Sequence, residues 1–304
     1  MIFDFIIIGA GLSGSYAASK LVKTGKSVLV LEKSRGIGGR CSTKPISSDI
    51  VDYGCQYINP KTNLVKNILK DLEKNKILNL VEIKKAKKVY ISPYGMNKVP
   101  QYFSMNVPVL TNTRVHKIEK NYSHWLIKTD LTDFKSRFLI SSIPIHQNIN
   151  LFKDSNFNLR SEDLPKIDYK SLFTIMYASS SLNRTILSEP NEDFSWICNN
   201  TLKGLRNINN IYTINTSSSL TNKLMGQKKD KIKILLKKKL ELFGMENLKN
   251  LSIHFWKYAY SDSSSGIETY FDSKHNLGLC GDAFGKGKVD GAITSADSLV
   301  KKII

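Results

Sequence analysis

A glycine-rich turn near the start of the chain lies between two apolar runs, and this arrangement restricts the fold more than any other feature. Residues 3–9 form the first run, and the glycines follow as Gly9, Gly11 and Gly14 in the spacing G-x-G-x-x-G. A second apolar run then ends at Glu32. Strand, glycine turn, helix, strand and acid, in this order, are typical of a dinucleotide-binding domain. The sequence therefore predicts an α/β fold with a Rossmann-type domain.

Each part of this turn suits the binding of a pyrophosphate. Gly9 permits a tight turn, Gly11 has no Cβ and lets a pyrophosphate lie against the backbone, and Gly14 lets helix and strand pack closely. The helix N-terminus offers unpaired N–H groups and a partial positive charge. Glu32 can accept hydrogen bonds from ribose hydroxyls and would repel a 2′-phosphate, which disfavours NADP. The predicted cofactor-binding residues are Gly9, Ala10, Gly11, Leu12, Ser13, Gly14, Glu32 and Lys33. The alternative is a glycine-rich turn without a ligand.

The chain is strongly basic, with 45 Lys+Arg against 26 Asp+Glu in 304 residues and a net charge of +19. The densest run of lysines, at 228–239, contains apolar residues at helical spacing. This pattern predicts an amphipathic helix with a solvated basic face, and the alternative is a nucleic-acid or membrane site. We expect neither a nucleic-acid partner nor a membrane partner.

The four cysteines are scattered along the chain and form no C-x-x-C, so the sequence predicts neither a disulfide framework nor a metal site. No apolar stretch is long enough to span a bilayer. The N-terminal apolar run leads directly into the glycine turn and has no basic leader, which favours a strand over a signal peptide. We therefore expect a cytoplasmic protein.

A second glycine segment, Gly36-Ile-Gly-Gly-Arg40, follows the acid. A G-x-G-G-R segment just after the ribose acid is typical of FAD-binding flavoproteins of the amine-oxidase type. Its glycines let backbone amides, including that of Gly39, approach the second half of the cofactor, and Arg40 can face a phosphate. The alternative is a flexible basic loop.

Two stretches, Gly-Gly-Arg-Cys-Ser-Thr at 38–43 and Asp-Tyr-Gly-Cys-Gln-Tyr at 52–57, resemble the renalase-like branch of the FAD-dependent amine oxidases. The later segments Trp196-Ile-Cys-Asn-Asn and Gly204-Leu-Arg resemble the same group. Members usually carry His where this chain has Tyr53 and a small residue where it has Cys55. The resemblance implies that residues 54–57, with Gln56 as a cofactor contact, lie beside the isoalloxazine ring.

The stretch at 251–260 alternates aromatic and other residues, and family members have a similar His-x-Trp-x-Tyr-Ala pattern here. Alternation places His254, Trp256, Tyr258 and Tyr260 on one side of a strand. The resemblance implies that this side forms a wall for a planar substrate, and the alternative is that the aromatics are sheet core. The predicted wall of the substrate pocket is Gln56, Tyr57, Trp256 and Tyr258.

The C-terminal segment supplies the other half of the predicted FAD site. An apolar run ends in Gly281 and Asp282, whose carboxylate can accept a ribityl hydroxyl, and the last helix opens near Asp290. Its N-terminus can stabilise the negative charge that develops on a reduced flavin. The cofactor-binding residues predicted here are Gly281, Asp282, Asp290, Gly291 and Ala292. Val115, in a predicted hairpin of 114–118 and 124–129, would face adenine by resemblance.

These segments predict two domains. Residues 1–57, 105–147 and 275–304 would form a GR2-like, Rossmann-type FAD-binding domain. Residues 58–104 and 148–274 would form an α+β substrate or cap domain built on an antiparallel sheet. We expect the substrate between them, against non-covalent FAD.

The resemblance implies an FAD-dependent oxidase that takes a hydride from dihydro-isomers of NAD(P)H, with O₂ as acceptor and H₂O₂ as product. The substrate would then be a small anionic dihydronicotinamide nucleotide, which suits a basic chain. One alternative is another flavin enzyme, such as a flavin amine oxidase, for which Lys257 is the candidate lysine near flavin N5. The other alternative is a flavin-binding module without turnover.

Overall fold

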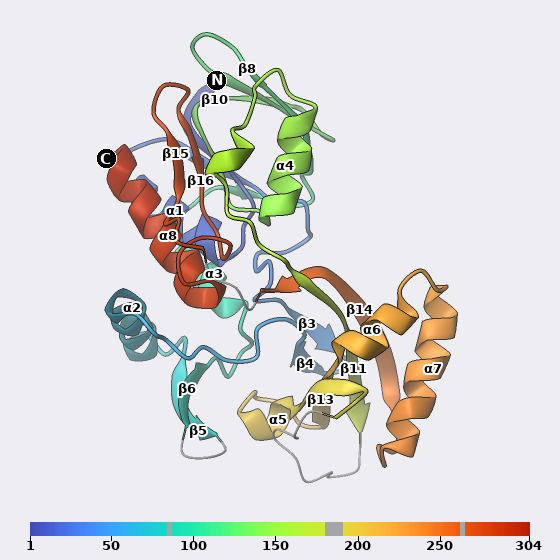
Figure 1. Ribbon diagram of the computed structural model, residues 1–304. Coiled ribbons are helices and arrows are strands. Elements are labelled where there is room, and N and C mark those ends of the chain that lie inside the picture. The colour runs from blue at the N-terminus through green and yellow to red at the C-terminus, as the bar shows by residue number, and fades with distance from the viewer. Residues whose placement is uncertain (84–86, 180–190, 262–264) are drawn as a thin grey trace.

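The computed structural model describes residues 1–83, 87–179, 191–261 and 265–304 (Figure 1). These residues form two bodies, each built on its own main sheet. The strands are β1 (Ile2–Ile8), β2 (Val28–Leu31), β3 (Thr43–Ile46), β4 (Asp49–Asp52), β5 (Asn79–Ile83), β6 (Lys87–Ile91), β7 (Val109–Leu110), β8 (Val115–Lys120), β9 (Trp125–Thr129), β10 (Asp133–Ser141), β11 (Lys170–Ser179), β12 (Phe194–Asn199), β13 (Asn210–Thr216), β14 (Lys249–Tyr260), β15 (Tyr270–Asp272) and β16 (Leu277–Leu279). The helices are α1 (Leu12–Val22), α2 (Asn63–Lys74), α3 (Lys98–Phe103), α4 (Ile145–Lys153), α5 (Asn200–Lys203), α6 (Ser218–Leu224), α7 (Lys229–Leu242) and α8 (Lys288–Ile303), with a 3₁₀-helix η1 at Ser161–Asp163.

The main sheet of the first body is the Rossmann-type sheet that the glycine motif predicts. It has eight strands in the order β15-β16-β10-β1-β2-β7, with β9 and β8 continuing from β10 as an antiparallel extension. The central strand β1 pairs in parallel with β2 and β10, and its Ile6 and Ile7 are fully buried. A strand covered on both faces requires such an unbroken apolar run. The predicted hairpin is confirmed as β8 and β9.

Helices α1 and α8 lie side by side on one face of this sheet, although they come from opposite ends of the chain (Figure 1). The Tyr16 hydroxyl of α1 donates a 2.8 Å hydrogen bond to the Asp297 carboxylate of α8. Their buried residues share one hydrophobic cluster with Val65 of α2 and Val99 of α3. Two helices of segment 58–104, which we assigned to the cap, thus pack on the first body, because their apolar faces fill the space beside α1 and α8.

The opposite face of the first sheet is covered by α4 and the chain that follows it. Phe152, Leu164 and Ile167 are buried in one cluster with residues of β1, β2, β9, β10 and β16. Strand β15 also joins this sheet by antiparallel pairing with β16. These packings differ from the predicted boundaries at 148 and 275, because the cap sheet begins only at β11 and ends with β14.

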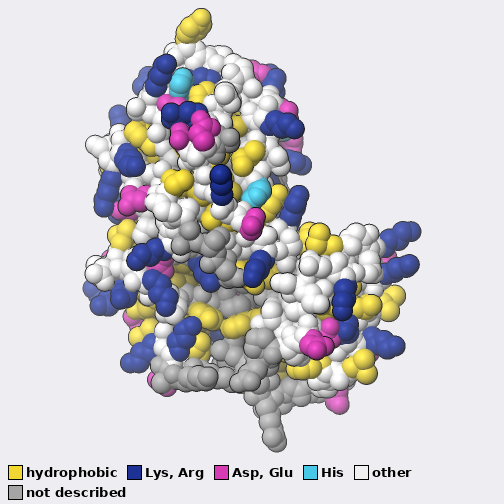
Figure 2. Space-filling model, in the orientation of Figure 1, with side chains coloured by type: hydrophobic (Ala, Val, Ile, Leu, Met, Phe, Trp, Pro, Cys, Tyr) yellow, Lys and Arg dark blue, Asp and Glu magenta, His cyan; other side chains and the backbone are white. Residues whose placement is uncertain are grey.

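The second body is the predicted antiparallel sheet of an α+β cap. Its strands follow the order β12-β13-β11-β14, and every neighbouring pair is antiparallel. Helices α6 and α7 cover one face, and α7 contributes Ile232, Leu236 and Leu240 to the core. The predicted Lys-rich amphipathic helix is therefore confirmed. Figure 2 shows Lys and Arg side chains spread over the visible face of the molecule, not gathered in one patch.

The β3–β4 hairpin joins the two bodies. Ile46 and Val51 of the hairpin pack against Met176, Ala178 and Ile211 on the face of the cap sheet that α6 and α7 leave free. The hairpin follows directly after the second glycine segment, so this contact fixes the cap beside the predicted cofactor loops. Within the described ranges, no helix has the length and apolar character needed to cross a membrane.

Candidate active site

The first glycine turn is closed by backbone contacts that side chains would block. Gly9 has a φ of +101°, a region that favours glycine, and its N–H donates to the Leu31 carbonyl at 2.9 Å. A Cβ on Gly14 would lie 2.1 Å from the Gly9 carbonyl oxygen and 2.5 Å from the Ser142 hydroxyl. Ala10, Leu12 and Ser13 are buried in the same turn. The turn therefore presents backbone, not side chains, at the N-terminus of α1.

Glu32 is buried at the end of β2 and connects the two loops beside it. One carboxylate oxygen accepts the Ala10 N–H at 2.8 Å, and the other accepts the Ser34 N–H at 2.7 Å. An ionised carboxylate has about four acceptor positions, so two donors leave room for ribose hydroxyls. Glu32 therefore holds the glycine turn in place and still has positions that can accept hydrogen bonds from a ligand.

A cavity of about 430 Å³ opens beside this acid. It brings together five of the predicted site residues, which are Gly9, Glu32, Lys33, Val115 and Tyr258. The remaining lining residues are Ile8, Leu31, Thr113, Arg114, His116, Ile143, Gln147, Asn150, Leu151 and Lys257. A cavity lined by both aliphatic and polar side chains, with the Glu32 acid and the cations Lys33 and Arg114 around it, suits a nucleoside that carries phosphate.

The second glycine segment lies directly against the first. The Gly38 N–H donates to the Ala10 carbonyl at 3.0 Å, and Gly38 forms a parallel bridge with Gly11. Gly39 has a φ of +54°, and a Cβ on it would lie 3.0 Å from the Cα of Gly11. The two segments therefore form one continuous backbone surface, which we call the glycine cradle and define as residues 9–14 and 36–39.

Arg40 and Asp282 were predicted to contact different parts of the cofactor, and the structure pairs them with each other. The Arg40 guanidinium forms a bidentate ion pair with the Asp282 carboxylate, and one of its two hydrogen bonds measures 2.7 Å. The Tyr169 hydroxyl donates to the same carboxylate at 2.9 Å. Burial disfavours a charged guanidinium, but the Asp282 carboxylate outweighs it, so the pKa of Arg40 is raised. This ion pair connects the N-terminal and C-terminal halves of the candidate site.

The start of α8 has a different role from the one predicted. The Asp290 carboxylate accepts the Lys61 N–H at 3.0 Å, the Thr62 N–H at 2.8 Å and the Thr62 hydroxyl at 2.9 Å. These contacts tie α8 to the beginning of α2, so Asp290 anchors two helices instead of facing a ligand. A Cβ on Gly291 would lie 2.4 Å from the Phe284 carbonyl oxygen, and Ala292 is buried in the helix packing.

Gly281 lies where β16 ends, between the ion pair and α8. Its φ is +150°, and its N–H donates to the Ser295 hydroxyl of α8 at 2.9 Å. A Cβ there would have the Ser142 carbonyl oxygen at 3.8 Å as its nearest neighbour, so the backbone is open toward the cradle.

Two residues of the aromatic side of β14, His254 and Trp256, contact Tyr53 of the loop at 53–57. The Trp256 ring stacks on Tyr53, with centroids 5.5 Å apart and planes 24° apart, and its indole N–H donates to the Tyr53 carbonyl at 3.0 Å. The His254 ring contacts the Tyr53 and Trp256 rings. Burial, together with the nearby Lys44 ammonium, lowers the pKa of His254. These three rings form an aromatic cluster, in which Tyr53 and Trp256 stack and His254 lies edge-on to both.

The other predicted wall residues lie outside this cluster. Tyr258 stacks on His146, with centroids 5.5 Å apart, and lines the cavity beside Glu32. Tyr57 contacts Trp196 of the cap, with centroids 5.8 Å apart. Gln56 is buried, and its amide donates to the Asp52 carbonyl at 2.7 Å. The four residues predicted as one wall therefore each have different neighbours.

The structure also reveals a buried ion pair that the sequence did not indicate. The Lys203 ammonium of α5 lies 2.8 Å from the Asp52 carboxylate of β4 and 3.3 Å from the Gln56 amide oxygen. Only 3% of the Lys203 side chain and none of the Asp52 side chain is exposed. The pair links the cap to the loop beside the glycine cradle. Lys257, the lysine that sequence reasoning named, is exposed, with its ammonium 5.4 Å from the Tyr258 ring centroid.

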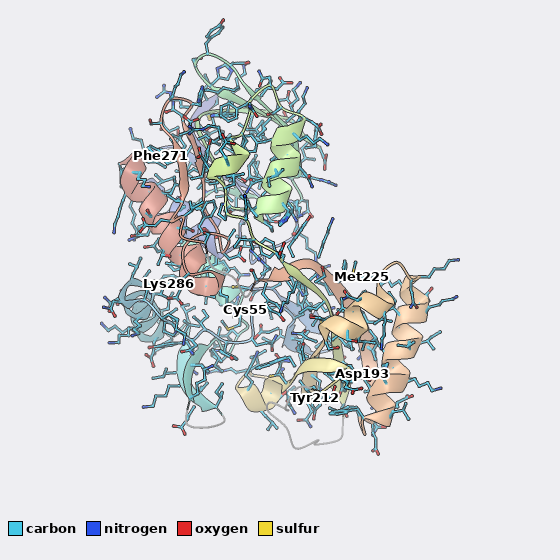
Figure 3. The ribbon with its side chains drawn as sticks, viewed as in Figure 1. Cys55, Asp193, Tyr212, Met225, Phe271 and Lys286 are labelled. Carbon is cyan, nitrogen blue, oxygen red and sulfur yellow. The ribbon has the colours of Figure 1, made fainter. Side chains whose placement is uncertain are left out.

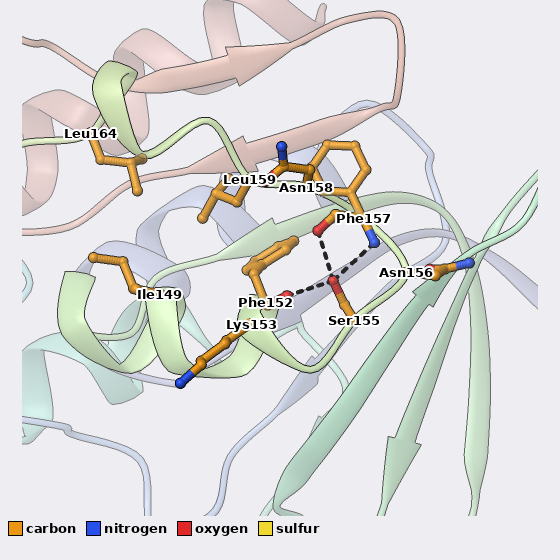
Figure 4. Close-up of a pocket in the computed structure, with 9 residues that line it drawn as sticks. All are labelled: Ile149, Phe152, Lys153, Ser155, Asn156, Phe157, Asn158, Leu159 and Leu164. Carbon is orange, nitrogen blue, oxygen red and sulfur yellow. Dashed lines mark hydrogen bonds between the residues drawn. The ribbon is translucent and has the colours of Figure 1, made fainter.

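A second cavity, of about 470 Å³, lies beside α4 and away from the cradle (Figure 4). Its lining residues are Ile149, Phe152, Lys153, Ser155, Asn156, Phe157, Asn158, Leu159 and Leu164. The Ser155 hydroxyl donates to the Phe152 and Phe157 carbonyl oxygens at 2.8 and 2.9 Å. Among the described residues that line it, none was predicted as a site residue, and we assign the site to the first cavity.

Comparisons with known proteins agree with the fold and with the glycine turn. Residues 7–72 match the NAD(P)-binding Rossmann-like domain. The chain is 29% identical over 92 residues to putrescine oxidase from Kocuria rosea, which is 30% of this chain and 19% of that protein. It is 39% identical over 71 residues to flavin-containing amine oxidase A from Bos taurus, which is 23% of this chain and 14% of that protein. The matched segments thus span less than a fifth of these relatives.

A solved structure extends the likeness to the whole fold. The crystal structure of a putative protoporphyrinogen oxidase from Exiguobacterium sp. 255-15 aligns with a TM-score of 0.73 and 10% identity, over 98% of each chain. The predicted fold class, a Rossmann-type domain with an α+β cap, is therefore confirmed. The resemblance to flavin-dependent amine oxidases is confirmed at this coarser level, through the N-terminal segment.

Proposed function

We propose that the protein is an FAD-dependent oxidoreductase of the oxidase type. The observation that carries this proposal is the glycine cradle, where two backbone segments meet at the N-terminus of α1 and continue into the cavity beside Glu32. A Cβ on Gly39 would lie 3.0 Å from the Cα of Gly11, so the two segments can approach this closely only without a side chain there, and the surface that they form is backbone. The similarity of the N-terminal segment to flavin-containing amine oxidase A supports the same cofactor.

The residues around the cradle fit non-covalent FAD from end to end. Glu32 would hold the adenosine ribose, Val115 would face adenine, and the N–H groups at the start of α1 would hold the pyrophosphate. Gly281 and the remaining acceptor positions of Asp282 would serve the ribityl chain. When bound, FAD supplies the acceptor for a hydride, which carries two electrons. Re-oxidation of the flavin by O₂ then gives H₂O₂.

The substrate we propose is a dihydro-isomer of NAD(P)H. Its oxidation restores an aromatic pyridinium, so aromatisation supplies the driving force. The stacked rings of Tyr53 and Trp256 offer a flat surface for a planar ring, and the Lys44 ammonium lies 5.5 Å from the Tyr53 ring centroid, where it would attract phosphate. This chain therefore orients the ring and neutralises the charge of the nucleotide.

Anaerobic mixing tests this substrate class. FAD-loaded protein should lose its flavin absorbance when it is mixed with NADH isomers reduced at other ring positions, and admitted O₂ should give one H₂O₂ for each substrate molecule. Ordinary NADH is the control. If every isomer leaves the flavin oxidised, the substrate proposal is wrong, while the flavin spectrum still tests the cofactor.

A flavin amine oxidase is the second candidate, because the N-terminal segment is similar to putrescine oxidase and to amine oxidase A. Lys203 is the lysine that lies buried beside the loop at 53–57, so it replaces Lys257 as the lysine to test in this candidate. Diamines and arylalkylamines in the same anaerobic assay distinguish the two candidates. Bleaching by an amine and not by the nucleotides would favour the amine oxidase.

A further inference from the structure

Two of the four cysteines lie on neighbouring chain segments beside the cradle. The β3–β4 ladder continues beyond its strands, because the Tyr53 N–H donates to the Ser42 carbonyl at 3.1 Å and the Cys55 N–H to the Arg40 carbonyl at 2.7 Å. A Cβ on Gly54 would lie 2.1 Å from the Arg40 carbonyl oxygen, so the two backbones are in direct contact. This pairing places Cys41 and Cys55 on adjoining segments in one hydrophobic cluster, where the Cys55 thiol donates to the Tyr57 carbonyl at 3.2 Å.

The two thiols differ in exposure and in acidity. Cys41 is buried, whereas Cys55 is partly exposed and lies near the junction of the two bodies in Figure 3. The hydrogen bond from Cys41 lowers the pKa of Cys55, and the Lys203 ammonium adds to this effect against burial and the Asp52 carboxylate. The same hydrogen bond, together with burial, raises the pKa of Cys41.

The other two cysteines, Cys198 and Cys280, are buried. Burial raises the pKa of Cys198 to about 11 and that of Cys280 to about 12. A thiol reacts as its thiolate, so these two are inert references within the same molecule. A more acidic thiol in a partly exposed residue, with a second thiol on the adjoining segment, is the arrangement of a nucleophile with its resolving partner.

We propose that Cys41 and Cys55 form a peroxide-sensitive dithiol that closes to a reversible disulfide. The Cys55 thiolate attacks one oxygen of hydrogen peroxide, the O–O bond breaks, and the departing hydroxide takes a proton and leaves as water. The Cys41 sulfur then attacks the Cys55 sulfenic acid, an S–S bond forms, the S–O bond breaks, and the hydroxide leaves as water with the proton of Cys41. Two thiols are oxidised by two electrons, and one peroxide is reduced to two waters.

The test uses the whole protein and added hydrogen peroxide, so it does not depend on flavin turnover. The protein is treated with one to two equivalents of peroxide, alkylated and digested without reduction, and its peptides are analysed by mass spectrometry. The expected product is a peptide pair linked through Cys41 and Cys55, with the free thiol count falling from four to two. Dithiothreitol should restore four thiols.

Three variants separate this proposal from general oxidation. Cys41→Ser should leave a sulfenic acid at Cys55 that dimedone traps, Cys55→Ser should leave Cys41 reduced, and Cys198→Ser should form the disulfide at the wild-type rate. The proposal is overturned if the wild type forms no linked peptide, or if Cys198 or Cys280 is oxidised as fast as Cys55. Cys55 over-oxidised to sulfinic acid in the wild type, with Cys41 still free, would also overturn it.

Discussion

Replacing Lys203 by methionine should destabilise the protein far more than loss of an ordinary surface lysine. The substitution keeps the aliphatic stem but leaves the fully buried Asp52 carboxylate without the ammonium at 2.8 Å. One carboxylate oxygen keeps the Thr43 hydroxyl at 2.5 Å and the Met96 N–H at 2.8 Å, and the other loses its ion pair. Breaking a buried pair in this way costs about 3–5 kcal/mol, and the two remaining donors place Lys203→Met near about 3 kcal/mol.

The measurement is urea unfolding followed by tryptophan fluorescence, together with the melting temperature. For a chain of this size about 3 kcal/mol corresponds to a drop in Tm of roughly 6 °C. The matched control is Lys239→Met, because Lys239 pairs with Asp193 at 2.7 Å with 31% and 37% of the two side chains exposed. Loss of such a surface pair costs less than about 1 kcal/mol.

A double variant tests the reasoning itself. Asp52→Asn with Lys203→Met removes both charges, so it should be more stable than Lys203→Met alone, because no unpaired carboxylate remains buried. The electrostatic account fails if Lys203→Met is no more destabilising than Lys239→Met. It also fails if the double variant is less stable than Lys203→Met by as much as Asp52→Asn alone destabilises the protein.

Three further predictions concern the cofactor turn and the aromatic cluster. Gly14→Ala should abolish FAD retention, measured as flavin absorbance per protein, because its Cβ would meet a backbone carbonyl oxygen at 2.1 Å; Gly266→Ala, outside the cradle and with no atom within 4 Å of its Cβ, should retain FAD, and equal flavin content would contradict this. Glu32→Ala should weaken FAD binding at least about tenfold in a fluorescence titration, because the buried Ala10 N–H and the Ser34 N–H lose their acceptor; stoichiometric FAD after dialysis would refute it. Burial and Lys44 lower the pKa of His254, so the unfolded chain binds more protons, and stability should fall as the pH drops below the ordinary value of 6.5. His254→Gln should flatten this dependence in melts between pH 5 and pH 8, and an unchanged slope would exclude the histidine as its cause.

Local pattern predicted the elements whose burial is decided within a short segment. The strand before the glycines, the helix after them and the strand that ends at Glu32 are β1, α1 and β2. The glycine spacing carries its own physical reason, because the Gly14 position has room for no Cβ. The alternation at 251–260 likewise placed Trp256 on the side that meets Tyr53.

The parts that sequence reasoning missed depend on contacts between distant segments. Lys203 lies 151 residues from Asp52, and in a chain with 45 Lys+Arg no local pattern distinguishes the lysine that becomes buried. Asp290 has the acidic helix-start pattern of a ligand site, yet the backbone of Thr62 uses its acceptors, which only the packing of α2 on α8 reveals. The domain boundaries at 148 and 275 differ from the packing for the same reason, since the chain packs on the first sheet after 148 and again before 275.

The pairing of α1 with α8 has a consequence for how the protein is made. The hydrogen bond from Tyr16 to Asp297 joins residues 281 positions apart, and β16, which ends just before Asp282, pairs with β10 only when the last part of the chain is available. A ribosome therefore releases the glycine turn long before its partner segments exist, at about 5–20 residues per second. The N-terminal and C-terminal halves of the candidate site come together only after synthesis reaches α8. FAD should consequently be incorporated after translation, and nascent chains arrested before β16 should emerge without it.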